Sequence, residues 1–370
     1  MQISTNTTGM EAGLTVATDK DGRDYCVVVI KGTFVTDDGE SILAEEQEPL
    51  VHADAHYGDP VETSIQYECD FARFKPRADV VVNGHAYSPT GQPVDEVEVS
   101  LEVNSLKKSV RVVGDRKWEL GALRPRISKP TPFLKMPLVY ERAFGGSDHT
   151  HDKPKYQGTE LRNLVGVGFQ KNSDPKSIEG TPLPNLEDPR YPIRGWSDTP
   201  PPAGFGILGR GWQPRITHAG TYDDKWLDHR FPFLPEDFDE RYFQSAPADQ
   251  QVPFFKGGEV VRCTNMTPDG RFEVTVPRVN VPILFRFRDR EVEADPNIDT
   301  LIVEPDENRF LLTWRATVPI GPRLHALREV FVGRRPLPQR ERGAKRRFET
   351  LNEMIVWEKK FGGSRTDRKG

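Results

Sequence analysis

Hydrophobic and polar residues alternate near both ends of the chain in the pattern of β-strands. Residues 97–103 (Val-Glu-Val-Ser-Leu-Glu-Val) change polarity at every step, and residues 109–114 repeat the alternation. A period of two places one face of a strand in a core and the other in water. The apolar runs at 25–30 and 79–87 predict further, more buried strands. Since no helical repeat separates these runs, the pattern favours an antiparallel β-sandwich over a parallel α/β sheet.

The same strand pattern returns after Gly257. Residues 259–264 and 271–276 flank Thr267-Pro268-Asp269-Gly270, a turn that predicts a hairpin. The meander is expected to continue through residues 282–287, 300–303, 309–317 and 327–332.

The middle of the chain, residues 126–250, has a different composition, and we call it the irregular region. It holds 16 of the 32 prolines and three of the six tryptophans. Proline lacks an amide donor and fixes φ, so regular helix or central strand is excluded over much of this stretch. Flexible linkers lack such aromatic content. The composition therefore predicts a long, ordered, irregular insertion packed on the β scaffold, with short helices near 223–230 and 236–243.

These patterns divide the chain into four expected regions. They are an N-terminal β-rich region (1–125), the irregular region (126–250), a C-terminal β meander (251–333) and a basic tail (334–370). From Gly321 to the end there are 14 Lys or Arg against 6 Asp or Glu, although the whole chain has a net charge of -5. Within the tail, a short amphipathic C-terminal helix is expected from the spacing of Phe348, Leu351, Ile355 and Trp357.

Composition and targeting signals favour a soluble protein of the cytoplasm. The three cysteines are widely spaced without a CxxC motif, which argues against a disulfide framework or a zinc motif. The first residues lack the basic and apolar segments of a signal peptide, and no apolar stretch is long enough to span a bilayer. The modest net charge favours neither nucleic acid nor a membrane surface as a partner.

Motifs for catalysis are absent from the sequence. It has no GxSxG elbow, Walker loop or HExxH pair. The best metal-like spacing is His52, Asp54 and His56, whose side chains would share one face of a strand. A polar loop is the commoner setting for such residues, so no metal or other cofactor is predicted. A metal-dependent hydrolase using these three residues remains the alternative function.

Arginine and aromatic residues of the irregular region are the candidates for binding a partner. Trp, Tyr and Arg dominate the energy of protein interfaces, so an ordered loop surface that carries them suits docking. The same residues can equally form an internal core. The candidates are Arg142, Phe144, Trp212, Arg215, Tyr222, Trp226 and Phe243.

Several strings of the chain, in order, resemble a bacterial domain-of-unknown-function family associated with type VI secretion effectors. They include residues 136–146 (MPLVYERAFGG), 163–169 (NLVGVGF), 183–189 (LPNLEDP), 220–227 (GTYDDKWL) and 243–251 (FQSAPADQQ). The resemblance covers nearly all of residues 20–320. It departs at Asn163-Leu164, where an Asn-Pro pair is commoner, and it stops before the basic tail.

The resemblance implies a non-enzymatic adaptor or chaperone. Such a protein binds a cognate effector and helps to load it on the spike and tip proteins of the secretion apparatus. The family offers no catalytic residues to carry over. A secreted structural or toxin-associated component is the further alternative.

Overall fold

A seven-stranded sheet joins the two β-rich ends of the chain. The computed structural model describes residues 2–37, 39–121, 124–171, 178–321 and 326–334. Strand β3 (Asp24–Asp37) pairs antiparallel with β25 (Arg309–Pro319), with Val35 opposite Arg309 and Tyr25 opposite Pro319. The sheet order is β19 (Gln251–Val252), β7 (Ala78–Val82), β24 (Asn297–Glu304), β25, β3 and β2 (Glu11–Thr18), with β4 (Glu40–Leu43) also on β3.

Two smaller sheets accompany the seven-stranded sheet. The five-stranded sheet has the order β18 (Leu186–Glu187), β10 (Leu106–Val113), β9 (Glu96–Val103), β20 (Val260–Thr264) and β21 (Arg271–Thr275). The four-stranded sheet has the order β1 (Thr5–Asn6), β26 (Leu327–Val332), β22 (Ile283–Phe287) and β23 (Glu291–Ala294). Most pairings are antiparallel, and β7 with β24 is one of the parallel exceptions.

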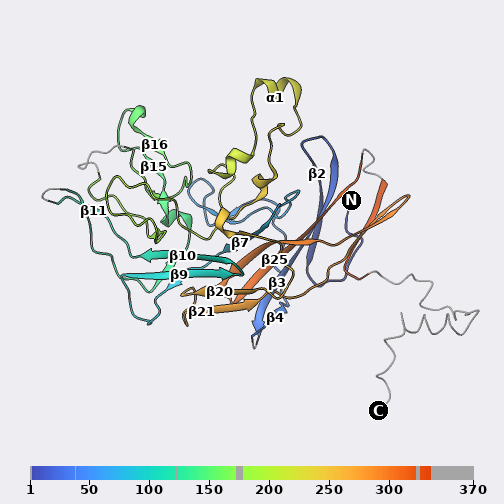
Figure 1. Ribbon diagram of the computed structural model, residues 1–370, viewed down its shortest axis with the longest axis horizontal. Coiled ribbons are helices and arrows are strands. Elements are labelled where there is room, and N and C mark those ends of the chain that lie inside the picture. The colour runs from blue at the N-terminus through green and yellow to red at the C-terminus, as the bar shows by residue number, and fades with distance from the viewer. Residues whose placement is uncertain (1, 38, 122–123, 172–177, 322–325, 335–370) are drawn as a thin grey trace, which may run out of the picture. The chain divides into compact units, whose positions relative to one another are not determined.

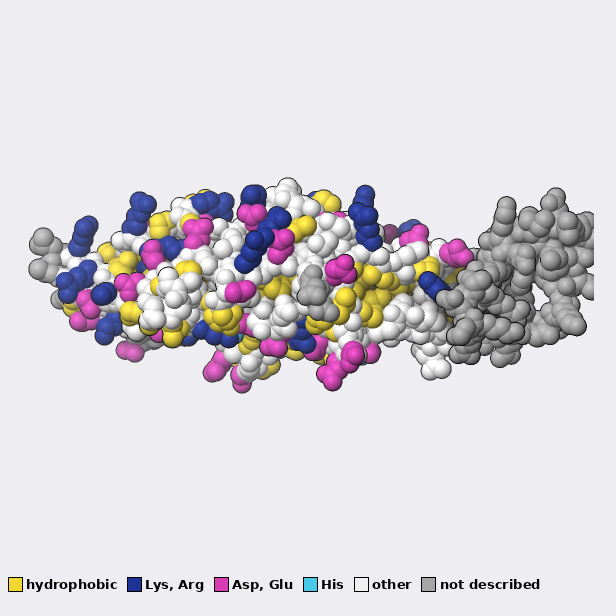
Figure 2. All heavy atoms as spheres, turned by 90° about the horizontal axis from the view of Figure 1, so that it is seen from below, with side chains coloured by type: hydrophobic (Ala, Val, Ile, Leu, Met, Phe, Trp, Pro, Cys, Tyr) yellow, Lys and Arg dark blue, Asp and Glu magenta, His cyan; other side chains and the backbone are white. Residues whose placement is uncertain are grey.

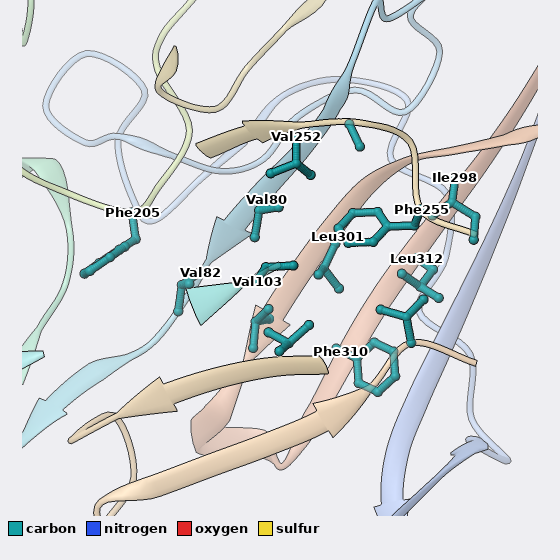
Figure 3. Close-up of a cluster of buried hydrophobic side chains, with 14 of the residues drawn as sticks. Val80, Val82, Val103, Phe205, Val252, Phe255, Ile298, Leu301, Phe310 and Leu312 are labelled. Carbon is teal, nitrogen blue, oxygen red and sulfur yellow. The ribbon is translucent and has the colours of Figure 1, made fainter. Parts of the chain in front are cut away.

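The main core lies between the seven- and five-stranded sheets. Val80 and Val82 of β7 and Leu301 of β24 belong to the same buried cluster as Leu101 and Val103 of β9. Figure 3 shows side chains of β7, β24 and β25 gathered around this core, close to Val103. Alternate residues of each strand supply these side chains, as the period-two pattern requires.

The opposite face of the seven-stranded sheet is covered by loops. Val81, Ile302 and Leu311 point to that face and pack against Ile207 and Ala246 of the irregular region. This second layer explains why every residue of β7 is buried. Ordered loops therefore take the place that helices occupy in an α/β protein.

The remaining regular elements of the described structure are short. The two-residue and three-residue strands pair as β5 (Ala55–His56) with β6 (Ile65–Tyr67), β8 (His85–Tyr87) with β13 (Lys135–Pro137), β11 (Trp118–Glu119) with β12 (Arg126–Ile127), β14 (Phe144–Gly145) with β17 (Val167–Gly168), and β15 (Ser147–Asp148) with β16 (Gly158–Thr159). The helical segments are α1 (Asp224–His229) and the 3-10 turns η1 (Tyr140–Arg142), η2 (Pro154–Tyr156), η3 (Arg215–His218), η4 (Glu240–Phe243), η5 (Ala248–Gln250) and η6 (Pro305–Glu307).

The expectation of a mainly β, sandwich-like fold is confirmed. The helix expected near 223–230 corresponds to α1, whereas only the last part of 236–243 is helical, as the 3-10 turn η4. The amphipathic helix and the basic tail from residue 335 onward lie outside the described residues. Among the helices of the described part, none is long and apolar enough to cross a membrane.

The surface carries charges of both signs on the face shown in Figure 2. Lys and Arg side chains lie among Asp and Glu side chains across this face, with hydrophobic side chains gathered between them. Interspersed charges do not create the broad positive field that attracts a phosphate backbone.

Candidate functional site

Residues 220–238 form a projecting segment, which we call the arm. It rises from the body of the molecule with α1 at its end (Figure 1). Its base is closed by Thr221, whose N–H and hydroxyl donate to the Asp237 carboxylate at 2.9 and 2.7 Å. Just outside, the Asp239 N–H donates to the His218 carbonyl at 3.0 Å. The two Thr221 hydrogen bonds hold the pKa of Asp237 below its ordinary value.

The sequence Asp223-Asp224-Lys225-Trp226 starts the helix of the arm. The Asp223 side chain accepts the N–H of Trp226 at 2.8 Å, the bond of an N-cap. The Trp226 indole N–H donates to the Phe233 carbonyl at 2.8 Å, which ties the returning segment to α1. The arm therefore has a defined shape before any partner binds, and less entropy is lost on docking.

Large apolar side chains of the arm face solvent. The exposed fractions are 54% for Tyr222, 57% for Leu227, 64% for Phe231 and 45% for Phe233. The Trp226 ring lies edge-on between two of them, with centroids 4.8 Å from Tyr222 and 5.7 Å from Phe231. Contiguous exposed aromatics of this kind are typical of a surface that another molecule covers.

Charged side chains surround these aromatic residues. Asp224, Lys225, Asp228 and Glu236 make no ion pair or side-chain hydrogen bond within the described part of the chain. A hollow of about 290 Å³ beside α1 is lined by Trp226 and Arg230, among others. An apolar centre with unpaired charges at its rim is the usual anatomy of a protein interface.

Beneath the arm, Arg215 is buried and holds the surrounding loops together. Its Nε donates to the Tyr242 carbonyl at 2.9 Å and its Nη1 to the Leu208 carbonyl at 2.8 Å. Its Nη2 bonds the Glu68 carboxylate, which also forms an ion pair with Arg210 at 3.0 Å. The guanidinium thus satisfies loop carbonyls that regular secondary structure would otherwise pair.

The same charge network reaches the seven-stranded sheet. Lys75 lies 3.9 Å from Glu68 and 2.8 Å from Asp79 of β7. Asp79 also accepts from the Gln244 side chain at 2.7 Å and from the Ser245 N–H at 2.9 Å. These buried bonds position the segment that follows the arm on the sheet.

Two more of the predicted partner-binding residues lie near the base of the arm. Trp212 is buried, packs edge-on against Tyr140 at 5.4 Å and covers Gly209, where a Cβ would approach the indole to 2.7 Å. Phe243 is half-buried, with its ring 5.6 Å from that of Phe238. Trp212, like Arg215, belongs to the interior.

The remaining two candidates lie away from the arm. Arg142 donates to the Asn185 side chain at 3.0 Å and pairs with Asp115 at 3.3 Å. Phe144 is buried in a separate cluster with Trp118 and Ile178. Of the seven predicted residues, those on the arm itself are Tyr222 and Trp226.

The proposed metal ligands do not form a common strand face. His52 lies in a bend, and only Ala55–His56 is strand. The His52 ring stacks on Phe71 with centroids 4.9 Å apart. The described residues contain no group of three or more His, Cys, Asp or Glu side chains that could hold a metal ion.

Asp54, the central residue of that triplet, has protein partners instead. Its carboxylate accepts from Arg210 at 2.9 Å and from the Cys69 N–H at 2.9 Å. Burial alone would raise the pKa of Asp54, but the Arg210 and Cys69 hydrogen bonds outweigh it, and the pKa lies below its ordinary value. Asp54 therefore has a structural role in joining this loop to the irregular region.

A polar hollow that the sequence did not reveal lies at η6. It measures about 250 Å³ and is lined by Glu304, Asp306 and His85, among others. The His85 Nδ1 lies 2.7 Å from Asp306, and Arg309 Nε donates to Glu304 at 2.6 Å. Asp306 also pairs with Lys135 at 3.3 Å, so each carboxylate has a cationic partner, and the geometry is that of a structural ion-pair cluster.

That hollow could not be found from the sequence, where Pro305-Asp306-Glu307-Asn308 predicts only a turn. Burial raises the pKa of Asp306, but hydrogen bonds from Tyr87 and His85 outweigh it and the net pKa is lowered. These partners precede the turn by more than 200 positions. No local pattern connects residues so far apart.

The fold and the arm together define a mainly β sandwich-like scaffold that presents an ordered loop surface. The chain belongs to the bacterial family described as "Uncharacterized protein conserved in bacteria (DUF2169)", whose pattern matches residues 21–315. No curated relative and no solved structure shows a significant match to the chain.

Proposed function

We propose that the protein is an adaptor that binds a cognate effector of a type VI secretion system and helps to load it on the spike and tip proteins. The proposal assigns no reaction to the protein and places it in the cytoplasm, where an effector is met before export. Its support is the ordered set of strings that resemble an effector-associated family, together with the arm.

The observation that carries the proposal is the exposure of the aromatic residues on the arm. Tyr222 and Phe231 lie on either side of Trp226, and both are more than half exposed. Leaving such surface in water is unfavourable by roughly 25 cal/mol per Å². A partner that covers these rings gains that free energy, and the hydrogen bonds of α1 have already ordered them.

A secretion assay tests the proposal. Deleting the gene should abolish secretion of one effector while the apparatus still secretes its other substrates. The double change Tyr222→Ser with Phe231→Ser should give the same phenotype at unchanged adaptor level, because it removes the exposed rings and no buried contact of the sheets.

Val61→Ser is the matched control, since Val61 is 85% exposed but lies outside the arm. It should leave secretion unchanged. Co-purification of the full chain with the products of neighbouring genes supplies the direct readout. Unchanged effector secretion in the deletion strain, with no neighbouring product retained, would refute the proposal.

A further inference from the structure

Strand β10 has one fully paired edge and one edge that is paired over only part of its length. On one side it pairs with β9 from Leu106 to Val113. On the other side it pairs with β18 at Arg111 and Val112 alone. In the described part of the chain, no other strand pairs with that second edge.

Backbone geometry identifies the groups that the open edge presents. Val103 and Leu106 flank the two-residue turn of the β9–β10 hairpin, so they form a hydrogen-bonded pair, and even-numbered residues of β10 bond β9. The odd-numbered residues face the other way, as the Val113 N–H donating to the Asn185 carbonyl at 2.8 Å confirms. Lys107 and Ser109 therefore direct their N–H and C=O groups to the open edge.

The chain's own strand β18 does not reach these groups. Glu187 lies opposite Arg111, so the residue that would face Ser109 is Pro189. Proline has no N–H to donate, and the chain turns away there, with the Tyr191 N–H donating to the Asp188 carbonyl at 2.8 Å. The outward backbone groups of Lys107 and Ser109 make no hydrogen bond to the described part of the chain.

A groove of about 540 Å³ lies along this open edge. Its walls include the turn after β18 and segments of the irregular region. Four prolines line them (Pro189, Pro201, Pro202 and Pro247), together with Tyr191 and Ala203. Lys108, on the other face of β10, bonds Asp249 at 2.9 Å and Gln250 at 2.7 Å and so holds one wall in place.

We propose that this groove binds a short extended segment of another polypeptide, which adds to β10 as a further strand. Lys107 and Ser109 supply the donors and acceptors of the ladder, at the spacing that an extended chain matches. The open edge runs from Lys107 to Val110, because β18 already pairs with Arg111, and at about 3.3 Å per residue it accommodates about four residues.

The lining also specifies the chemistry of the segment. Its charges balance, with Lys107, Lys108 and Arg190 against Glu98, Asp188 and Asp249. Recognition therefore relies on the main chain and on uncharged, apolar side chains that contact the prolines and Tyr191. Prolines beside an edge disfavour pairing with a whole second sheet, so the occupant is a single segment rather than a second copy of this chain.

Peptide binding to the full chain tests the proposal. The probe is acetyl-Val-Thr-Val-Thr-Val-amide, and its fully N-methylated analogue is the control that cannot form a ladder. At millimolar peptide, exchange of the Lys107 and Ser109 amide hydrogens should slow at least tenfold, while the analogue has no effect. Absence of protection at both amides overturns the proposal.

Two variants make the test specific. Ser109→Pro removes an outward donor that β9 does not use, and it should weaken peptide binding at least tenfold while the thermal unfolding transition persists. Ser109→Ala keeps the backbone and should bind as the unchanged chain does. Equal binding by the Pro variant, or a concentration-dependent dimer in sedimentation that the Pro variant abolishes, overturns the proposal. The groove is separate from the arm, so either test can fail without the other.

Discussion

Two neighbouring parts of the irregular region have similar residue types but opposite environments. One is the segment that contains Trp212 and Arg215, and the other is the arm that follows it. Both Trp212 and Arg215 are buried: the Trp212 ring packs against Tyr140, and the Arg215 guanidinium donates to loop carbonyls. Tyr222 and Phe231 of the arm are more than half exposed. The difference shows that aromatic and arginine content does not by itself identify a docking surface.

Position relative to the seven-stranded sheet explains the difference. Ile207, just before the buried segment, packs on the outer face of the sheet, so the residues that follow it are enclosed. The arm extends beyond the sheet (Figure 1) and is braced by the Trp226 indole and by hydrogen bonds between its residues Arg230 and Glu236 and Lys20 of the β2–β3 turn. Rigid support at its base allows its apolar residues to remain exposed.

The largest difference in stability is expected between two tryptophan replacements, one in the buried segment and one in the arm. Trp212→Ala should lower the free energy of unfolding by about 3–5 kcal/mol, because it leaves a cavity under the loops. Trp226→Ala should lower the same free energy by less than about 1 kcal/mol, because its ring is partly exposed and stabilises the arm rather than the sheets. Urea unfolding followed by far-UV circular dichroism measures both, and equal losses would contradict the comparison.

Arg215→Lys should have the next largest effect. The ammonium group cannot reproduce the bonds to the Tyr242 and Leu208 carbonyls and to Glu68, so a loss of roughly 2–3 kcal/mol is expected from unsatisfied buried groups. Arg241→Lys is the control, because its side chain is exposed and bonds Asp239 within the same turn. The Arg241 variant should change the free energy of unfolding by less than about 0.5 kcal/mol. A similar loss in both variants would contradict the role assigned to Arg215.

Asp54→Asn should alter the dependence of stability on pH. The pKa of Asp54 in the folded chain lies below its ordinary value of 3.8, so its stabilising contribution is present above that value and is lost as pH falls through the lowered pKa. The variant should be about 1–2 kcal/mol less stable at pH 7 and should lose less further stability below pH ~4. Parallel acid-unfolding curves would contradict the role assigned to Asp54.

The smallest effect is expected from Asp223→Ala, which removes the N-cap of α1. The free energy of local unfolding of the arm should fall by about 1 kcal/mol. Amide exchange in residues 224–231 should therefore become faster, while the global unfolding midpoint stays unchanged. Asp228→Ala, on the same helix, is the control and should leave exchange nearly unchanged. Slower exchange in the Asp223 variant would contradict the capping role.

Local patterns predicted many elements of the fold. Alternation at 97–103 and 109–114 corresponds to β9 and β10, and the turn at 267–270 joins β20 to β21. The short helix expected near residues 223–230 corresponds to α1. These predictions hold because side-chain period, turn residues and caps depend on neighbours a few positions away.

The candidate site was harder to predict. Trp212, Arg215, Tyr222 and Trp226 were all candidates for one surface, but the first two are buried and the last two belong to the arm. The open edge of β10 gave no signal, since it depends on where β18 ends and on which loops border it. Burial and edge pairing are set by chain segments that are far apart in sequence.

By itself, the sequence determined the positions of many strands, the proline-rich, irregular character of the middle of the chain and the short helix near residues 223–230, because each follows from local backbone sterics and side-chain periodicity. Only the tertiary structure decided that β3 and β25 join the two ends of the chain in one sheet, which aromatic residues are enclosed and which edge stays open. Those outcomes depend on long-range contacts, since apolar area leaves water and backbone groups find partners only when distant segments meet.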